Sequence, residues 1–435
     1  MVLSHLDMIS LFRNSAPYIN AHRGKTFVIM LSGEAVASDN LPTIIHDIAL
    51  LNSLGVRLII VHGARPQIEE RIAMRQIQGR FNDDVRITDK TTLECVKDAS
   101  GSVRSQIEAL LTMGLANSPM HGSQIRVASG NLVVAKPMGV RDGVDYENTG
   151  YVRRIDSEGI RNHLNDGYIV LLSPVGYSPT GEVFNLSHEE VATCAADAMK
   201  ADKLIAFSSH KGLITQDDTL LRNVELAKFE QLIAENALIN EPSVIHALAD
   251  SVRAGTPRAH CVSFAIDGSL LKELFTRDGT GSLVTENHYE RLRPAQIEDV
   301  GGILQLIKPL EESGALVKRS RERLEQEIAQ FTVIERDGMI IACAALYPYP
   351  DGFGEIACVA THTQYRGKNR GERLLEALST QARLQDINTL FVLTTLTAHW
   401  FLEQGFIEAD KDVLPSAKQE LYNFQRNSKV FTLEI

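Results

Sequence analysis

The sequence contains little that would place the chain in a membrane, outside the cell or around a metal ion. No apolar run approaches the ~18–20 residues of a membrane-spanning helix. The first residues contain no basic segment followed by an apolar core, so we expect no export. The five cysteines are odd in number, scattered and never arranged as a CxxC pair, which argues against a disulfide framework or a zinc site. These absences predict a cytoplasmic protein that holds no metal.

The charge balance excludes one further class of partner. The 55 acidic residues outnumber the 44 lysines and arginines, and the formal net charge is −11. The chain therefore lacks the electrostatic footprint of a nucleic-acid-binding protein. Its 435 residues, 44% hydrophobic and 23% charged, are typical of a globular protein with two or three domains.

The first part of the chain, residues 1–285, alternates apolar strands with helical stretches. Strands are expected to begin near Lys25, Leu58, Tyr168 and Leu204, and the earliest of them break at Gly- and Ser-containing turns. Acidic residues near the start and a lysine near the end predict a helix within residues 185–202. This alternation indicates an α/β domain with a mainly parallel central sheet and helices on both faces.

A polar linker, residues 286–292, separates this domain from a mixed α/β domain over residues 293–435. The Asp337-Gly338 pair predicts a tight hairpin between two strands. The other expected elements of this domain are helices over 293–306, 319–329 and 371–385, strands over 354–360, 389–394 and 428–434, and a short helix that ends at Gly405. The second domain therefore places a basic, glycine-bearing turn between a strand and a helix.

That turn is a candidate phosphate-binding site. Its residues are Arg366, Gly367, Lys368, Asn369, Arg370 and Gly371. Backbone N–H groups at a helix start, together with the positive end of the helix dipole, attract a pyrophosphate. Glycines allow close approach of the backbone, and the cations add charge. The alternative reading is a solvated basic turn.

The turn and the segment Thr394–Phe406 together resemble the GCN5-related N-acetyltransferase superfamily over about residues 290–435. The resemblance implies an acetyl-CoA cosubstrate whose diphosphate contacts residues 366–371. It also implies that Cys358, Val359 and Ala360 hold the pantetheine arm. Asn369 stands where the family pattern has a glycine, and asparagine tolerates a left-handed backbone better than most residues.

Acetyl transfer to an amine requires a base, a polarised thioester carbonyl and a stabilised thiolate. Glu355, at the head of its strand, is the candidate general base, because the superfamily often places an acid there; the alternative is an exposed strand-end carboxylate. Cys358 as an acyl nucleophile is the competing route, but a buried strand cysteine is usually a small hydrophobe, so we favour direct transfer.

The general acid is less clearly marked. Many superfamily members have a tyrosine where this chain has Phe401, which cannot donate a proton. The remaining candidates are Thr394, Thr395, His399 and a water molecule, or no acid at all. Thr394 ranks first.

Two basic segments of the second domain suit a dicarboxylate acceptor. The first contains Leu316, Lys318 and Arg319, and the second contains Arg426 and Ser428. Taken alone, such residues are usually surface cations. The segment that ends in the last strand, however, resembles the bacterial two-domain N-acetylglutamate synthase family. The resemblance implies L-glutamate as the acceptor.

The first domain resembles the amino acid kinase family, and acetylglutamate kinase in particular. The resemblance is carried by residues 27–33, 60–67, 172–176, 184–186 and 203–207. An active kinase of this family has a lysine where the chain has Met30, and glycines where it has Ala64 and Arg65. Because a thioether cannot neutralise a transferring phosphoryl group, we do not expect ATP-dependent phosphorylation.

A kinase fold without kinase chemistry suggests a regulatory domain. In the family, the effector L-arginine binds near the C-terminal end of this domain and near an N-terminal helix. The matching residues here are Thr276, Asp278 and Gly281, with Tyr18 at the end of a helix expected over residues 3–18. For Asp278 alone the plainer reading is a turn residue. The same helix implies a homohexamer.

Together the resemblances imply an enzyme that makes N-acetyl-L-glutamate from acetyl-CoA and L-glutamate, the first step of arginine biosynthesis, with feedback inhibition by L-arginine. Two alternatives stay open at this point. One is an acetylglutamate kinase with an appended acetyltransferase-like module. The other is a non-catalytic arginine sensor, which Asn369 and Phe401 would favour.

Overall fold

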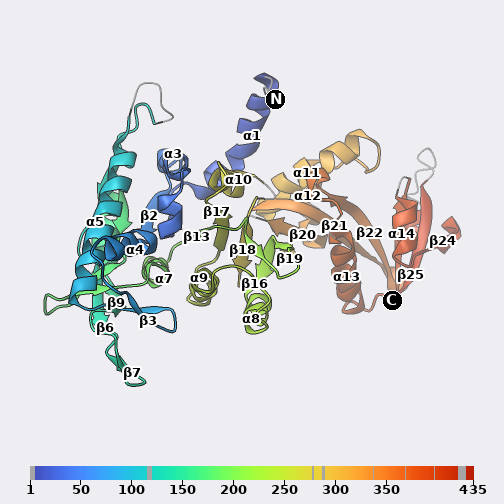
Figure 1. Ribbon diagram of the computed structural model, residues 1–435. Helices are drawn as coiled ribbons and strands as arrows, with labels where there is room; N and C mark the ends of the chain where they lie inside the picture. Colours follow the sequence, from blue (N-terminus) through green and yellow to red (C-terminus); the bar gives the residue numbers. More distant parts are fainter. Residues whose placement is uncertain are drawn as a thin grey trace. The chain divides into compact units, whose positions relative to one another are not determined.

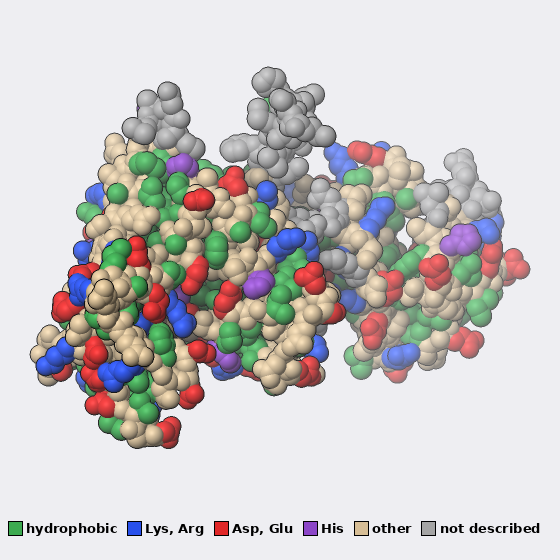
Figure 2. Space-filling model, in the orientation of Figure 1, with side chains coloured by type: hydrophobic (Ala, Val, Ile, Leu, Met, Phe, Trp, Pro, Cys, Tyr) green, Lys and Arg blue, Asp and Glu red, His purple; other side chains and the backbone are tan. Residues whose placement is uncertain are grey.

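A computed structural model describes residues 5–114, 120–276, 279–286, 290–336, 338–367, 369–395, 397–419 and 428–435. The chain divides into two compact units, residues 1–287 and 288–435 (Figure 1). On the face seen in Figure 2, acidic and basic side chains are interspersed over both units. None of the helices in the described ranges is both long and apolar enough to cross a membrane.

The first unit is built on an eight-stranded sheet whose neighbouring strands are parallel except for the β17–β18 pair. In spatial order the strands are β16 (Asn223–Glu225), β18 (Ser282–Thr285), β17 (Ala259–Ser263), β13 (Lys203–Ser208), β1 (Thr26–Leu31), β2 (Arg57–His62), β10 (Tyr168–Leu172) and β5 (Arg126–Ala128). The central strands are buried on both faces, which explains their continuous apolar sequences.

Alternate side chains of β1 enter two separate cores. Val28 and Met30 pack on one face, and Phe27, Ile29 and Leu31 on the other. The first face is covered by α6 (Ser157–Asn165), α7 (His188–Met199), α8 (Leu226–Ala234) and α9 (Pro242–Arg253). The second is covered by α2 (Gly33–Ala37), α3 (Leu41–Ser53), α4 (Arg65–Met74), α5 (Lys90–Thr112) and α10 (Ser269–Phe275).

Smaller elements complete the first unit. A four-stranded sheet contains β12 (Val183–Asn185), β11 (Val175–Tyr177), β6 (Val133–Pro137) and β9 (Gly150–Ile155). The two-stranded pairs are β3 (Arg80–Asn82) with β4 (Val85–Ile87), β7 (Val140–Arg141) with β8 (Val144–Asp145), and β14 (Leu213–Ile214) with β15 (Leu220–Leu221). Helix α1 (His5–His22) precedes the sheet and packs on α10.

The second unit is a seven-stranded sheet that is antiparallel except between β22 and β23. Its order is β19 (Arg291–Pro294), β20 (Phe331–Arg336), β21 (Met339–Tyr349), β22 (Phe353–Thr361), β23 (Thr389–Thr394), β25 (Lys429–Glu434) and β24 (Ile407–Ala409). Helices α13 (Arg370–Arg383) and α14 (Ala398–Glu403) pack on one face, and α11 (Val300–Glu312) and α12 (Arg321–Glu327) on the other. A last short helix is α15 (Ser416–Gln419).

The predicted fold class is confirmed in both halves: a mainly parallel sheet between helices, followed by a mixed sheet. Two local predictions were wrong. Arg291 and Leu292, assigned to the linker, belong to β19, because Leu292 pairs with Ile334 of β20. The helix expected from residue 293 begins only at Val300, after a single turn of 3₁₀-helix.

Candidate active site and effector site

The site in the second unit forms where two parallel strands separate. Strand β22 pairs with β23 only from Phe353 to Glu355, and the last pair joins Glu355 to Phe391. Beyond it, β22 continues beside β21, and β23 continues beside β25. Within the described residues, the facing edges of β22 and β23 therefore lose their ladder just after Glu355. An extended ligand can add to such an edge as a strand.

A β-bulge lies in the part of β22 that pairs with β21 but no longer with β23. Cys343 of β21 pairs with Ala360, and Ala345 pairs with Ala357, so two residues of β22 face one of β21. Cys358 has a φ of 55°, which is unusual for a non-glycine residue in a strand. Backbone outliers of this kind cluster at functional sites. The bulge falls on the residues predicted to hold the pantetheine arm.

Helix α13 starts at the predicted phosphate-binding turn. Arg366, Gly367 and Asn369 are exposed, and Lys368 lies outside the described residues. Gly367 has a φ of 82° and Asn369 a φ of 49°, so both adopt left-handed backbone. Asn369 thus adopts the left-handed backbone that asparagine tolerates better than most residues. The first N–H groups of a 14-residue helix follow directly.

The backbone at Asn369 makes a testable prediction. Asn369→Gly is expected to keep CoA affinity within about twofold, because glycine adopts the left-handed conformation freely. Asn369→Val is expected to weaken it at least about tenfold, since a β-branched residue resists positive φ. Calorimetry with CoA measures both variants. Equal affinity of the valine variant and the wild type would remove the turn geometry from binding.

The side chain of Arg370 does not point into the phosphate site. It is only 4% exposed and is held by both carboxylate oxygens of Glu290, with Nε 3.0 Å from Oε2, and by the carbonyl oxygen of Tyr365. The predicted contact through its guanidinium is therefore wrong, and only the backbone N–H of Arg370 remains available. Gly371 is pressed against Trp400, whose Cζ2 would lie 2.7 Å from an added Cβ.

Glu355 is 8% exposed, so it is not the exposed strand-end carboxylate of the alternative reading. Its carboxylate accepts hydrogen bonds from Lys418 Nζ at 2.7 and 2.6 Å and from the Tyr349 hydroxyl at 3.2 Å. Burial, and then the charge and hydrogen bond of Glu355, raise the pKa of Tyr349. Tyr349 is thus a neutral donor, and Lys418 forms an ion pair with Glu355. No sequence motif marks either of these two partners of Glu355.

Thr394 is buried at the end of β23, three residues beyond the partner of Glu355. Its hydroxyl lies 2.8 Å from that of Thr397 and accepts the Thr397 N–H at 3.0 Å. Phe401 packs between Trp400 and Phe406, so it is a core residue. The other two candidate acids, Thr395 and His399, are exposed.

The residues predicted to bind the acceptor are partly brought to the same site. Arg319 is half-buried, and its buried Nε has no hydrogen-bond partner among the described residues. Leu316 is half-buried against the α11 core, whereas Lys318 is exposed. Ser428 is buried immediately before β25, and Arg426 lies outside the described residues.

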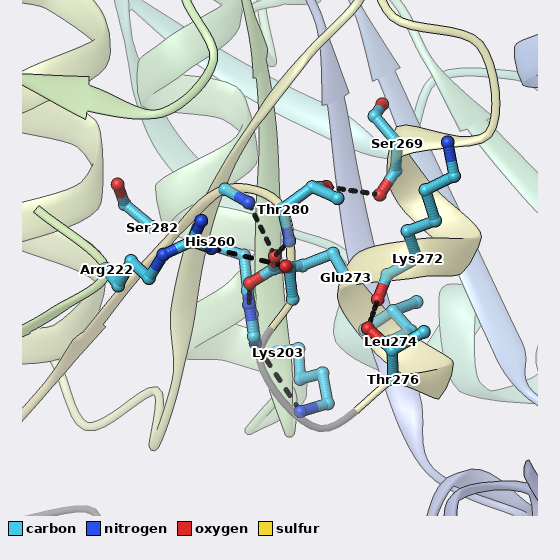
Figure 3. A network of polar contacts seen from close by, with 12 residues as sticks. Lys203, Arg222, His260, Ser269, Lys272, Glu273, Leu274, Thr276, Thr280 and Ser282 are labelled. Carbon is cyan, nitrogen blue, oxygen red and sulfur yellow. Dashed lines mark hydrogen bonds and ion pairs between the residues drawn. The ribbon is translucent and has the colours of Figure 1, made fainter. Parts of the chain in front are cut away.

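In the first unit, the predicted effector segment adjoins a buried polar network (Figure 3). His260 Nδ1 lies 2.8 Å from Glu273 Oε1, and Lys203 Nζ lies 3.5 Å from His260 Nε2. The other oxygen of Glu273 accepts the N–H groups of Thr280 and Gly281, each at 2.8 Å. Lys203 begins one of the strands that resemble the amino acid kinase family, whereas His260 and Glu273 lie in a strand and a helix that no sequence motif marks.

The charged and polar groups of this network shift one another's pKa. Burial alone would raise the pKa of Glu273, but the hydrogen bond and charge of His260 and the two backbone donors lower it to about 2. Burial, together with the charge of Lys203, lowers the pKa of His260. The result is an ionised carboxylate that is hydrogen-bonded to one ring nitrogen of His260, while Lys203 lies next to the other. A carboxylate of this kind is a potential partner for a cationic effector.

Helix α1 ends beside the same segment. His22 Nε2 lies 2.9 Å from the carbonyl oxygen of Leu274, and its ring contacts Phe275 at 5.6 Å between centroids. Tyr18 lies one turn earlier on α1 and is half-buried. Thr276 donates to the Lys272 carbonyl oxygen at 2.5 Å, and Asp278 lies outside the described residues. The two predicted parts of the effector site are thus neighbours.

The kinase positions support the loss of phosphoryl chemistry. Met30, where the family has lysine, is 1% exposed and packs in an apolar core with Val28 and Val61. Ala64 precedes α4 and is buried, and Arg65 begins that helix. Among the described residues, no cation therefore occupies the lysine position at the end of β1.

Each part of the chain matches a known protein family. Residues 25–263 match the amino acid kinase family, and residues 327–408 match the acetyltransferase (GNAT) domain. The separated strands, the bulge and the start of α13 all belong to the second match. The fold and the site define an acetyltransferase of the GNAT class joined to an amino acid kinase domain.

Relatives that match nearly the whole chain identify the family within this class. The amino-acid acetyltransferase of Azotobacter vinelandii is 54% identical over 98% of this chain and 99% of its own length. N-acetylglutamate synthase from Neisseria gonorrhoeae, complexed with coenzyme A and L-arginine, superposes with a TM-score of 0.90 at 35% identity over 98% of this chain and 99% of that one. The same relative with coenzyme A and N-acetyl-glutamate gives a TM-score of 0.62 over the same shares. The chain belongs to the amino-acid acetyltransferase family, the N-acetylglutamate synthases.

Proposed function

We propose that this enzyme transfers the acetyl group of acetyl-CoA directly to the α-amine of L-glutamate, with Glu355 as the general base, in the first step of arginine biosynthesis. The observation that carries the proposal is the position of Glu355, buried at the point where β22 and β23 separate. The N-terminus of α13 supplies N–H donors for the diphosphate. Residues 358–360 would align the pantetheine arm along the free edge of β22.

The chemistry needs two proton transfers from nitrogen. The α-ammonium first loses a proton to Glu355, and the amine then attacks the thioester carbon to form a C–N bond. The tetrahedral adduct loses a second proton from nitrogen as the C–S bond breaks. One of the two protons ends on the CoA thiolate, for which Thr394 is the proposed donor, and the other is released. In direct transfer the acetyl group is never bonded to the thiol of Cys358.

Acceptor specificity follows from the cations near the bulge. The buried Nε of Arg319 has no hydrogen-bond partner among the described residues, and a carboxylate of glutamate would supply one. We assign Arg426, Ser428, Lys318 and Leu316 to the same acceptor site. A relative of this chain has been crystallised with N-acetyl-glutamate, which is the product expected here.

Regulation is proposed to reside in the first unit, as feedback inhibition by L-arginine. A relative binds L-arginine, and the segment with Thr276, Asp278 and Gly281 adjoins both α1 and the ionised Glu273. Inhibition requires that arginine bind one conformation or assembly more tightly than another. A homohexamer is part of this proposal, and light scattering would test it.

A thiol-release assay tests the function. With acetyl-CoA and L-glutamate we expect CoA thiol to be released, with much less release for other amino acids and a decrease when L-arginine is added. No release with any amino acid, together with retained arginine binding, would favour a non-catalytic sensor instead. Consumption of ATP with N-acetylglutamate would restore the kinase alternative.

A further inference from the structure

A lysine from a distant part of the chain forms an ion pair with the proposed general base. Lys418 lies on α15, and its Nζ is within 2.7 Å of Oε1 and 2.6 Å of Oε2 of Glu355. Among the described residues, the other hydrogen bond to the carboxylate comes from Tyr349. Sixty-three positions separate Lys418 from Glu355, so only the fold brings them together.

The ammonium group of Lys418 lies where the ammonium group of the acceptor would have to lie for Glu355 to act as its general base. A base that deprotonates the acceptor must face an ammonium group within hydrogen-bond distance, directly or through one water molecule. The ammonium that now faces both oxygens belongs to Lys418. Lysine and the acceptor present the same chemical group, an R–NH₃⁺ with three donors. The two therefore compete for one carboxylate.

The ion pair between Lys418 and Glu355 is partly shielded from water, and a second cation can still displace Lys418. The side chain of Lys418 is 18% exposed and that of Glu355 10%, so water screens the pair less than it screens a surface ion pair. Lysine nevertheless reaches its partner through a flexible four-carbon chain with rotatable donors, unlike the rigid fork of arginine. Partial exposure gives Lys418 a route to solvent when a second cation arrives.

We propose that Lys418 is an intramolecular stand-in for the acceptor ammonium: it neutralises Glu355 until L-glutamate binds, and the α-ammonium of glutamate displaces it. This inference rests on the proposed role of Glu355 as general base. Lys418 is a positioning residue that acts through Glu355 and does not touch the reacting atoms.

The stand-in has a protective consequence. Without a cation, Glu355 could take a proton from a water molecule that attacks the thioester carbon. A C–O bond then forms, the C–S bond breaks, and the proton passes from Glu355 to the leaving thiolate, giving acetic acid and CoA. While Lys418 covers both oxygens, this side reaction is suppressed.

The test is Lys418→Met, which keeps the length of the side chain and removes the ammonium. We expect the KM for L-glutamate to fall about three- to tenfold with kcat retained within about twofold, because an internal competitor is lost. Thiol release from acetyl-CoA without glutamate should rise. Lys418→Arg should show neither change. Lys308→Met, at an exposed lysine of α11, is the matched control.

Two results would overturn the inference. The first is an unchanged or higher KM for glutamate in Lys418→Met, and the second is a loss of kcat as large as that of Glu355→Gln. Neither result is confused with misfolding if Lys418→Gln, a polar neutral variant, behaves in the same way and the Trp400 fluorescence is native. If wild-type protein releases no thiol, the proposed function fails, and calorimetry of glutamate binding to the CoA complex still tests the competition.

Discussion

Glu355→Gln is expected to lower kcat about 10²–10⁴-fold while CoA affinity stays within about twofold. The substitution keeps the shape of the side chain but removes the proton acceptor, and general-base catalysis typically contributes a factor of this size. Glu355 lies at the head of the separated strands and is not among the residues assigned to the diphosphate, so the diphosphate contacts should survive. The thiol-release assay measures kcat, and calorimetry measures CoA binding.

Controls distinguish chemistry from structure in this experiment. The neutral amide of the Glu355→Gln variant cannot form the ion pair with Lys418, so the variant must be shown to unfold at the same denaturant concentration as the wild type. Tyr349→Phe removes the other hydrogen bond to Glu355 without removing its charge, and we expect only a few-fold change in kcat. Unchanged turnover in Glu355→Gln would take Glu355 out of the mechanism.

Glu290→Gln is expected to destabilise the second unit by about 3 kcal/mol, because it leaves a buried guanidinium without its countercharge. Glu290 contacts Arg370 through both oxygens, lies 3.2 Å from Arg373 Nη1 and 3.9 Å from Arg336 Nη1. One carboxylate therefore balances three arginines, two of them on the first turn of α13. We also expect weaker CoA binding, since the helix start is held in place by this contact.

The single tryptophan makes this measurement specific. Trp400 belongs to α14 in the second unit, so its fluorescence during urea unfolding reports that unit alone. Glu298→Gln, at an exposed acidic residue of the same unit, is the matched control, and Glu290→Asp should recover part of the stability. A midpoint equal to that of the control would mean that Arg370 is satisfied by other groups.

Several site features follow from local sequence. The strand, basic turn and helix around residues 354–385 could be predicted because strands, glycine-bearing turns and helix starts are encoded within a few residues. The left-handed Asn369 could be predicted for the same reason. Met30 could also be interpreted from the sequence alone: it predicts that this domain does not transfer a phosphoryl group, because a thioether cannot neutralise the transferring charge.

Other features depend on contacts between distant residues. The guanidinium of Arg370 looked like a phosphate ligand because its sequence neighbours are cations, yet Glu290, 80 positions earlier, claims it. The network of Lys203, His260 and Glu273 joins β13, β17 and α10, and no short motif marks it. The linker likewise ends before the predicted residue 292, because Leu292 pairs with Ile334 of β20.

The sequence by itself determined the order of elements and the two-part α/β organisation, and it predicted a CoA cosubstrate and the loss of kinase chemistry, because these depend on residue types at short spacing. Only the tertiary structure decided which charges meet: Lys418 with Glu355, Glu290 with three arginines, and His260 with Glu273. The physical reason is that an ion pair depends on separation in space and on burial. Neither quantity can be read from separation along the chain.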